Sequence, residues 1–196
     1  HTRGFHDAPF EVTLACDTPN TLILYTLDGS EPGVTAAGRL AGLPYTEPIP
    51  VARTTCLRAR ALRPAWQQSG VQTHTYIFHD QVIRQPANPP GFPPLWAGST
   101  ADYEMDPEVV NDPAYRNEVI PGLRSIRTMS IVMNPDDLFG SQRGIYSNAT
   151  GRGDGWERPA SVEILDPDGS TAYTGRCGIR IHSYSWRPHD RTKKHS

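Results

Sequence analysis

The sequence has few cysteines, almost no net charge and no long apolar run, and each shortage excludes a class of protein. Its three cysteines, Cys16, Cys56 and Cys177, are too few and too scattered for a zinc site built on clustered ligands. The formal net charge of −2 creates no field that would attract nucleic acid or a membrane surface, so we expect no nucleic-acid partner. No apolar run reaches the ~18 residues that a membrane helix needs, so we expect no membrane span.

Proline and glycine are abundant instead. The 19 prolines and 17 glycines accompany a hydrophobic content of 37 %, which is typical of a β-rich protein with many loops. A length of 196 residues allows one large domain or two small ones. The sequence shows no signal peptide and begins at His1 as if in mid-sequence, so we expect a piece of a larger protein.

Residues 1–79 contain short runs in which apolar and polar residues alternate, the period of a strand with one buried face. Turn residues separate the runs. One such group, Asp28-Gly29-Ser30, suits a hairpin turn better than a ligand-binding loop. The pattern predicts an antiparallel β-sandwich that folds independently. The expected strands lie at residues 10–14, 22–26, 49–51, 57–61 and 71–77.

Two strings in this segment carry a family resemblance. RGFHDAPFEVTLACDTPNTLILYTLDGSEP (residues 3–32) and YTEPIPVARTTCLRARAL (residues 45–62) resemble the immunoglobulin-like or fibronectin-like module at the C-terminus of chitobiases and hexosaminidases. The combination of YTLDGSEP with TTCLRARA is the most specific part. The resemblance covers nearly the whole segment and implies an all-β accessory domain without catalysis.

Two of the cysteines fall in the same segment. An oxidising environment would allow Cys16 and Cys56 to bridge two of its strands. Cys16 shares the phase of Leu14, whereas Cys56 is out of phase with Leu57, which places the two thiols on different faces. We favour free thiols over a bridge.

Residues 80–102 read as a proline-rich linker. The five prolines between residues 85 and 103 exclude a helix or a central strand, so we expect a stiff spacer. The sequence beyond it mixes helix and strand signals. We expect short helices from Asp106 and from Asp112 (the latter to about residue 123), a buried strand at 129–133, a helical turn at 135–139 and a returning strand at 145–146.

Residues 156–181 predict a β-hairpin. The tetrapeptide DPDG at residues 166–169 has tight-turn chemistry, because proline presets φ, aspartate bonds back to the backbone and glycine accepts a positive φ. Beyond it Cys177, Ile179 and Ile181 alternate with small or polar residues and predict one apolar face. A hairpin alone is marginal in water, so we expect the open edge at residues 178–182 to favour self-association by strand addition, increasing with salt.

Several strings between residues 103 and 196 resemble the N-terminal part of CotH-type kinase domains, the spore-coat kinase family with its large secreted bacterial relatives. In chain order they are MDPEVVNDPAY (105–115), TMSIVMNPDDLFGSQRGIYSN (128–148), WERPASVEILDPDG (156–169), GIRI (178–181) and the final KHS. The two resemblances together imply a mainly β chain. A fibronectin-like or immunoglobulin-like β-sandwich (1–79) would be followed, after the linker, by an incomplete α+β kinase-like N-terminal lobe (103–196).

This second resemblance also implies a function for the whole protein. The family transfers phosphate from ATP to serine or threonine of extracellular proteins with Mg²⁺ or Mn²⁺, so the partner would be a secreted substrate or the cell-surface matrix. The location would be extracellular or at the cell surface. Two departures stand out: HSYSWR at residues 182–187 replaces a glycine-rich turn, and the family's acidic catalytic and metal-binding residues lie beyond the last residue. We expect this chain alone to be inactive and to hold no cofactor.

Lys194 is the strongest candidate site residue under this resemblance, because a lysine at that strand entry pairs with nucleotide phosphates. Lys193 is a rival because the register is open, and Arg187 could assist. These three residues are assigned to nucleotide binding, with no catalytic residue and no metal ligand. A solvated basic tail is the competing interpretation.

Residues 148–155 hold three short motifs: a glycosylation sequon (NAT, 148–150), an integrin-type tripeptide (RGD, 152–154) and glycines spaced G-x-G-x-G. Short motifs recur by chance and no strand-to-helix context is present, so a glycine-rich surface loop is the favoured interpretation. The rival function for the whole protein is a non-catalytic structural or adhesive one at the cell surface. In that case the sandwich would bind carbohydrate or protein, and acidic metal ligands downstream would favour the enzyme instead.

Overall fold

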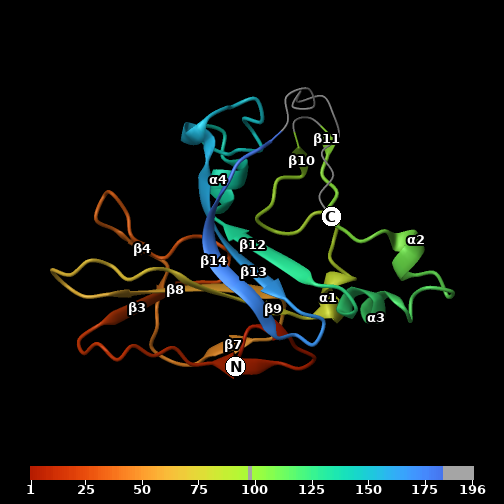
Figure 1. Ribbon diagram of the computed structural model, residues 1–196, viewed down its shortest axis with the longest axis horizontal. Coiled ribbons are helices and arrows are strands. Elements are labelled where there is room, and N and C mark those ends of the chain that lie inside the picture. Colours follow the sequence, from red (N-terminus) through yellow and green to blue (C-terminus); the bar gives the residue numbers. More distant parts are fainter. Residues whose placement is uncertain (97–98, 183–196) are drawn as a thin grey trace.

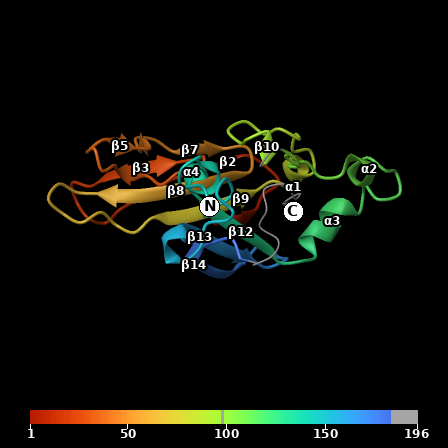
Figure 2. The ribbon, with the colours of Figure 1, turned by 90° about the horizontal axis from the view of Figure 1, so that it is seen from above.

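The computed structural model describes residues 1–96 and 99–182 and is mainly β, as composition and strand pattern predicted. Figure 2 shows three layers: a small sheet, a five-stranded sheet in the middle and a three-stranded sheet on the opposite side. Three short helices lie together at one side of the sheets (Figure 1). They are α1 (His79–Val82), α2 (Pro107–Val110) and α3 (Val119–Arg124).

The first two layers form a β-sandwich. The middle sheet has the order β1 (Gly4–Phe5), β9 (Gln72–Ile77), β8 (Thr55–Leu62), β3 (Leu22–Thr26) and β6 (Leu43–Pro44). β1 pairs with β9 in parallel and the other pairs are antiparallel. The facing layer pairs β2 (Phe10–Val12) with β7 (Ile49–Val51), and β4 (Gly33–Val34) forms a separate hairpin with β5 (Leu40–Ala41).

Strand alternation places an apolar core between these two layers. Its buried members are Val12, Ile49, Val51, Leu57, Tyr76 and Phe78. The predicted β-sandwich is confirmed, although Leu14 lies beyond the end of β2. All three cysteines are free thiols.

The proline-rich segment after the sandwich forms turns and a small hairpin of β10 (Leu95–Trp96) with β11 (Ser99–Thr100). The helix expected from Asp106 is α2, and the Asp106 carboxylate accepts a hydrogen bond from the Glu108 amide at 2.9 Å. The helix expected from Asp112 is shorter than predicted, because turns occupy residues 113–118 and α3 begins only at Val119. Pro121 has no N–H to donate, so a continuous helix could not complete its hydrogen bonds there.

The third layer is an antiparallel sheet in the order β12 (Thr128–Met133), β13 (Arg158–Leu165) and β14 (Thr171–Ile179). The hairpin predicted at the DPDG turn is confirmed: the Gly169 amide donates to the Asp166 carbonyl at 2.8 Å, and Gly169 has φ +82°. The apolar face predicted for β14 is also present. Cys177, Ile179 and Ile181 pack against a small core of Met133, Ile145 and Ala160, next to α4 (Pro135–Phe139).

One prediction for this layer is only partly right and another is wrong. β12 is a strand, but it is buried only at its end: Val132 and Met133 are 4 % and 9 % exposed, whereas Met129 and Ile131 keep 60 % and 51 % of their surface exposed. Ile145 and Tyr146 form turns instead of a strand: their amides donate to the carbonyls of Asp137 and Leu138, so the chain folds back on α4. Ile145 is nevertheless only 2 % exposed. The apolar pair at residues 145–146 therefore indicated a buried position correctly, but not the backbone conformation. The 3₁₀ turn η1 (Asp154–Trp156) leads into β13.

Across residues 1–96 and 99–182, no helix combines the length and the apolar character that a membrane crossing needs.

Candidate functional site

The residues assigned to nucleotide binding from the sequence, Arg187, Lys193 and Lys194, lie outside the described residues. In the part of the chain that the structure describes, no group of three or more His, Cys, Asp or Glu side chains could hold a metal ion. The sites that the structure does show are a groove beside α1, a polar joint between the second and third layers, and an arginine cluster under the β3–β4 loop.

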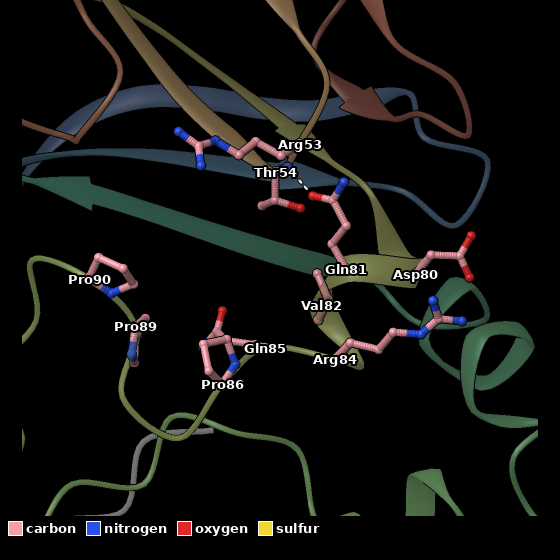
Figure 3. Close-up of a pocket in the computed structure, with 10 residues that line it drawn as sticks. All are labelled: Arg53, Thr54, Asp80, Gln81, Val82, Arg84, Gln85, Pro86, Pro89 and Pro90. Carbon is pink, nitrogen blue, oxygen red and sulfur yellow. Dashed lines mark hydrogen bonds between the residues drawn. The ribbon is translucent and has the colours of Figure 1, made fainter.

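The groove runs between the corner joining β7 to β8 and the proline-rich segment (Figure 3). It is a hollow of about 560 Å³ beside α1, and it adjoins a second hollow of about 820 Å³ that shares Arg53, Thr54 and Pro90 with it. The first hollow is lined by Arg53, Thr54, Asp80, Gln81, Val82, Arg84, Gln85, Pro86, Pro89 and Pro90.

Gln81 ties one wall of the groove to the sandwich. Its Oε1 accepts from the Thr54 amide at 3.0 Å (Figure 3), and its Nε2 donates to the Ala52 carbonyl at 2.9 Å. The Thr54 hydroxyl in turn accepts from the Phe78 amide at 3.0 Å. The corner and α1 therefore form one rigid wall whose amide groups are already satisfied.

The opposite wall consists of proline rings and an aromatic side chain. Prolines have no N–H, so this wall offers ligands mainly apolar contact. Phe92 continues it, with its ring edge-on to Tyr103 and Phe139 at centroid distances of 5.5 and 6.0 Å. Gln85 anchors the segment by donating to the Tyr103 carbonyl at 2.6 Å.

Charged side chains stand at the ends of the groove. Arg53 and Arg84 point in opposite directions in Figure 3, and neither forms a salt bridge with a carboxylate among residues 1–96 and 99–182. Asp80 is the acidic side chain of the first hollow. This arrangement suits an elongated ligand with an apolar body and negative groups. It places no nucleophile beside a general base.

The polar joint is centred on Glu163 of β13, which is 0 % exposed. Thr75 of β9 donates to its Oε2 at 2.5 Å, and the Thr75 hydroxyl lies 2.7 Å from that of Ser130 on β12. Arg3 Nη1 lies 2.9 Å from Glu163 Oε1, but its N–H is directed at Thr174 at 2.9 Å. Burial raises the pKa of Glu163, and the hydrogen bond from Thr75 and the charge of Arg3 oppose that rise.

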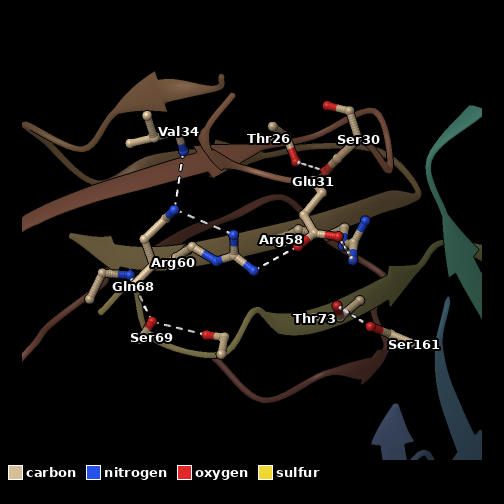
Figure 4. Close-up of polar contacts among 12 residues, drawn as sticks. Thr26, Ser30, Glu31, Val34, Arg58, Arg60, Gln68, Ser69, Thr73 and Ser161 are labelled. Carbon is tan, nitrogen blue, oxygen red and sulfur yellow. Dashed lines mark hydrogen bonds and ion pairs between the residues drawn. The ribbon is translucent and has the colours of Figure 1, made fainter. Parts of the chain in front are cut away.

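Two further contacts extend the joint. Thr73 of β9 donates to Ser161 of β13 at 2.8 Å (Figure 4), and both hydroxyls are buried. At the edge of the sandwich, Arg3 Nη2 lies 2.8 Å from His74 Nε2, so this nitrogen acts as the acceptor of a neutral ring. Burial, and then the Arg3 charge, lower the pKa of His74 to about 4. The joint thus combines directed polar contacts with partial exclusion of water.

The arginine cluster lies on β8 of the middle sheet. There Glu31, from the loop between β3 and β4, stands between Arg58 and Arg60 (Figure 4). Arg60 donates to Glu31 at 2.6 Å, and Arg58, which is 4 % exposed, donates to the Gly29 carbonyl at 2.9 Å. Burial lowers the pKa of Arg58. The hairpin turn predicted at residues 28–30 is wrong, because β3 pairs with β6 and β8 whereas β4 pairs with β5. These residues form a connecting loop in which the Ser30 amide donates to the Asp28 carboxylate at 2.9 Å, and the cluster holds this loop on the sheet.

The motif-rich loop at residues 148–155 has a structural role. The Asn148 amide nitrogen, the atom that a glycan would use, donates to the carbonyls of Ser141 and Gly144 at 3.1 and 3.0 Å. Trp156 packs on Gly151, where a Cβ would lie 2.3 Å from the indole, so this glycine does not line an open phosphate cradle. The Asp154 carboxylate is exposed and accepts from Arg180 at 3.0 Å.

Comparison with known proteins supports the resemblance of the first segment. Residues 12–76 match the family model described as Fn3 associated, and this range runs from the end of β2 almost to the end of β9. The match identifies this part of the chain as similar to a fibronectin-like associated module, and it does not extend to residues 103–196. No curated protein and no solved structure matches the chain.

Proposed function

We propose that the fibronectin-like module is the accessory part of a secreted multidomain protein, and that residues 103–196 begin a CotH-type kinase domain. The match of residues 12–76 supports the accessory module. The order of the CotH-like strings in the sequence supports the second part. The proposed boundaries are 1–79 for the module, 80–102 for the linker and 103–196 for the incomplete kinase-like part.

The observation that carries this proposal is the polar joint. A module that is only tethered to the next part of the chain by a flexible linker needs no buried contacts with it. Here Glu163 of β13 is fully buried against Thr75 of the sandwich and is paired with Arg3. The accessory module therefore sets the position of the β12–β14 sheet, as a scaffold for a catalytic domain would.

In the proposed whole protein, ATP and Mg²⁺ or Mn²⁺ would supply the phosphoryl group and its charge neutralisation. Lys194 or Lys193, assisted by Arg187, would pair with the phosphates, and the acceptor would be serine or threonine of an extracellular protein. Among the described residues, no group of three or more His, Cys, Asp or Glu side chains could hold the metal ions that this chemistry needs. We expect phosphate transfer by the 196-residue chain to remain at background.

Binding of a fluorescent ATP analogue to the proposed whole protein tests the nucleotide assignment, because we expect the 196-residue chain alone to hold no cofactor. We expect the double substitution Lys193→Ala with Lys194→Ala to weaken binding at least tenfold, because it removes the point charges proposed for the phosphates. Arg191→Ala is the matched control, since it removes one positive charge from the same segment. Equal losses in both proteins would indicate nonspecific charge attraction, and labelled-phosphate transfer that survives the double substitution would place the site elsewhere.

Limited proteolysis tests the boundaries. We expect a nonspecific protease to cut first between residues 85 and 103, because tight strand pairing protects the sandwich. The two halves should still co-elute after nicking, since the polar joint holds them together. Cuts within residues 10–77 at comparable rates would contradict an independently folded module.

The groove favours the second candidate, a cell-surface adhesive protein. Arg53 and Arg84 line a trough that has a proline-rich wall on one side and polar side chains on the other. We expect an acidic peptide or an anionic polysaccharide to bind there, and the double substitution Arg53→Ala with Arg84→Ala to reduce binding about tenfold. Arg39→Ala, in an exposed turn away from the groove, should leave it unchanged. If Arg39→Ala lost binding and the double variant did not, the ligand would not bind in this groove.

A further inference from the structure

A short segment near the start of the chain connects the sandwich to the third layer and to α3. Residues 3–7 include β1 and run along the edge of the middle sheet, where the His6 amide donates to the Ile77 carbonyl at 2.9 Å. The His6 ring lies edge-on to Tyr76 at a centroid distance of 5.6 Å, which attaches this part of the segment to the sandwich. We call residues 3–7 the strap, because its other residues reach across to the third layer, α1 and α3.

Both ends of the strap carry a charged side chain that is paired outside the sandwich. The Arg3 guanidinium lies 2.9 Å from Glu163 Oε1 on β13 and donates to the Thr174 hydroxyl on β14, also at 2.9 Å. Asp7 forms a salt bridge with Arg124 of α3. In the part of the chain that the structure describes, no other salt bridge joins the sandwich to the chain beyond the linker. The strap therefore supplies the ionic part of this connection.

Close packing holds the middle of the strap against the DPDG turn. A Cβ on Gly4, which has φ +124°, would lie 2.4 Å from the Gly169 carbonyl oxygen, so only glycine allows this approach. The Phe5 ring also contacts Gly169, where an added Cβ would lie 3.4 Å from it. The same ring is edge-on to His79 of α1 at a centroid distance of 4.5 Å. The strap thus contacts β13, β14, the turn between them and two helices.

The two surfaces that the strap holds together are largely polar where they meet. Thr73 and Thr75 of β9 contact Ser161, Ser130 and Glu163 of the third layer. Hydroxyl and carboxylate groups bind water when such a surface opens, so separating it costs less free energy than separating an apolar core of the same area. The third layer also packs on its own small core next to α4. The sheet can therefore leave the sandwich without losing that core.

We propose that the strap is a releasable clamp. In place, it fixes the β12–β14 sheet and α3 on the sandwich; when it lifts off them, the polar joint opens while both layers stay folded. The strap thereby switches the third layer between a fixed and a free position relative to the sandwich. This inference concerns the joint alone, and it holds whether or not the sheet belongs to a kinase domain.

The three free cysteines of the chain report separately on the joint and on the third layer. Cys56 lies directly opposite Thr75 in the β8–β9 pair, so its thiol is on the face that the third layer covers. Burial raises the pKa of the Cys56 thiol, so it reacts slowly while the joint is closed. Cys177 packs with the small core of the third layer, and the exposed Cys16 gives a reference rate.

Maleimide labelling of the native 196-residue chain, followed by mass spectrometry of the cysteine peptides, tests the proposal. Gly4→Ala pushes the strap off the DPDG turn, and Arg3→Met removes its polar contacts with β13 and β14. Each variant should raise the labelling rate of Cys56 at least tenfold relative to that of Cys16, because the joint opens. The rate of Cys177 should stay unchanged, because the third layer stays folded.

Gly38→Ala is the matched control, because Gly38 also has a positive φ, +74°, but no other part of the chain lies within 4 Å of the added Cβ. This variant should leave the Cys56 rate unchanged. An equal rise in the control would overturn the proposal, since backbone strain anywhere would then open the joint. Unchanged Cys56 labelling in both strap variants would overturn it too, because the hydroxyl contacts would then suffice. A parallel rise at Cys177 would mean that the sheet unfolds instead of detaching, and the proposal would fail.

Discussion

The two interfaces on either side of the middle sheet differ in chemistry. Toward β2 and β7 the sheet presents an apolar core that includes Leu57 and Tyr76. Toward β12–β14 it presents Thr73 and Thr75, which meet Ser161 and the buried Glu163. An apolar core gains free energy from any close packing, whereas a polar joint is favourable only when each group finds its partner. The second interface therefore specifies one arrangement of the layers more than it supplies bulk stability.

The largest expected effect comes from opening the apolar core. Leu57 is 3 % exposed between the sandwich layers, so Leu57→Ala should lower the free energy of unfolding by about 2–5 kcal/mol. Leu40→Ala, at a 57 % exposed position, should change it by less than about 0.5 kcal/mol. Urea unfolding measures both. Similar losses in the two variants would mean that the sandwich core is not packed as described.

Breaking the polar joint should have the next largest effect. Arg3→Met leaves the buried Glu163 carboxylate without its ion pair and should cost about 3 kcal/mol. The double variant Arg3→Met with Glu163→Leu should recover much of that loss, since no buried charge remains unpaired. Urea unfolding of the two single variants and the double variant gives the coupling energy. An additive result would show that the two side chains do not interact.

The joint also predicts two opposing pH dependences. The folded-state pKa of His74 is lowered from 6.5 to about 4, so only the unfolded chain binds this proton in between, and stability should fall as pH drops from about 6.5 toward 4. The pKa of Glu163 is raised above 4.5, so its contribution is greatest in acid and should decline as pH rises through the window above 4.5.

Single substitutions separate the two dependences. His74→Gln should remove the loss of stability toward acid, and Glu163→Gln should remove the loss toward higher pH. Urea midpoints measured from pH 4 to pH 7 report both. If neither variant changed how the urea midpoint depends on pH, neither side chain would be as buried in solution as it is in this structure.

The smallest expected effect belongs to an exposed ion pair. Arg127 is 69 % exposed and lies 2.7 Å from Asp166. Arg127→Ala should cost at most about 0.5 kcal/mol at low salt and nothing measurable at high salt, because water and ions screen this pair. Thermal unfolding at two salt concentrations measures the difference. A salt-independent loss would indicate that the arginine stem contributes by packing.

Local chemistry predicted most of the turns, the caps and most of the strands. The DPDG turn, the Asp106 cap and the strand at residues 22–26 each follow from a few neighbouring residues, and all are present. The return strand at residues 145–146 was wrong because an apolar pair indicates burial in a turn as well as in a strand. The groove was missed because Arg53 and Arg84 are 31 positions apart in the sequence and only folding brings them to one trough.

By itself the sequence determined that the chain is mainly β, with a sandwich of short strands in its first segment and a hairpin near its end. These properties follow from periodicity and turn chemistry, which act over a few residues. The fibronectin-like character of the first segment came from its resemblance to a family, which the match of residues 12–76 supports. Only the tertiary structure decided which face of β12–β14 is covered. Alternation divides Met129 and Ile131 from Ser130, but it cannot say that the polar face packs inward, because that depends on Thr75 and Arg3 being placed opposite Glu163 by a different part of the chain.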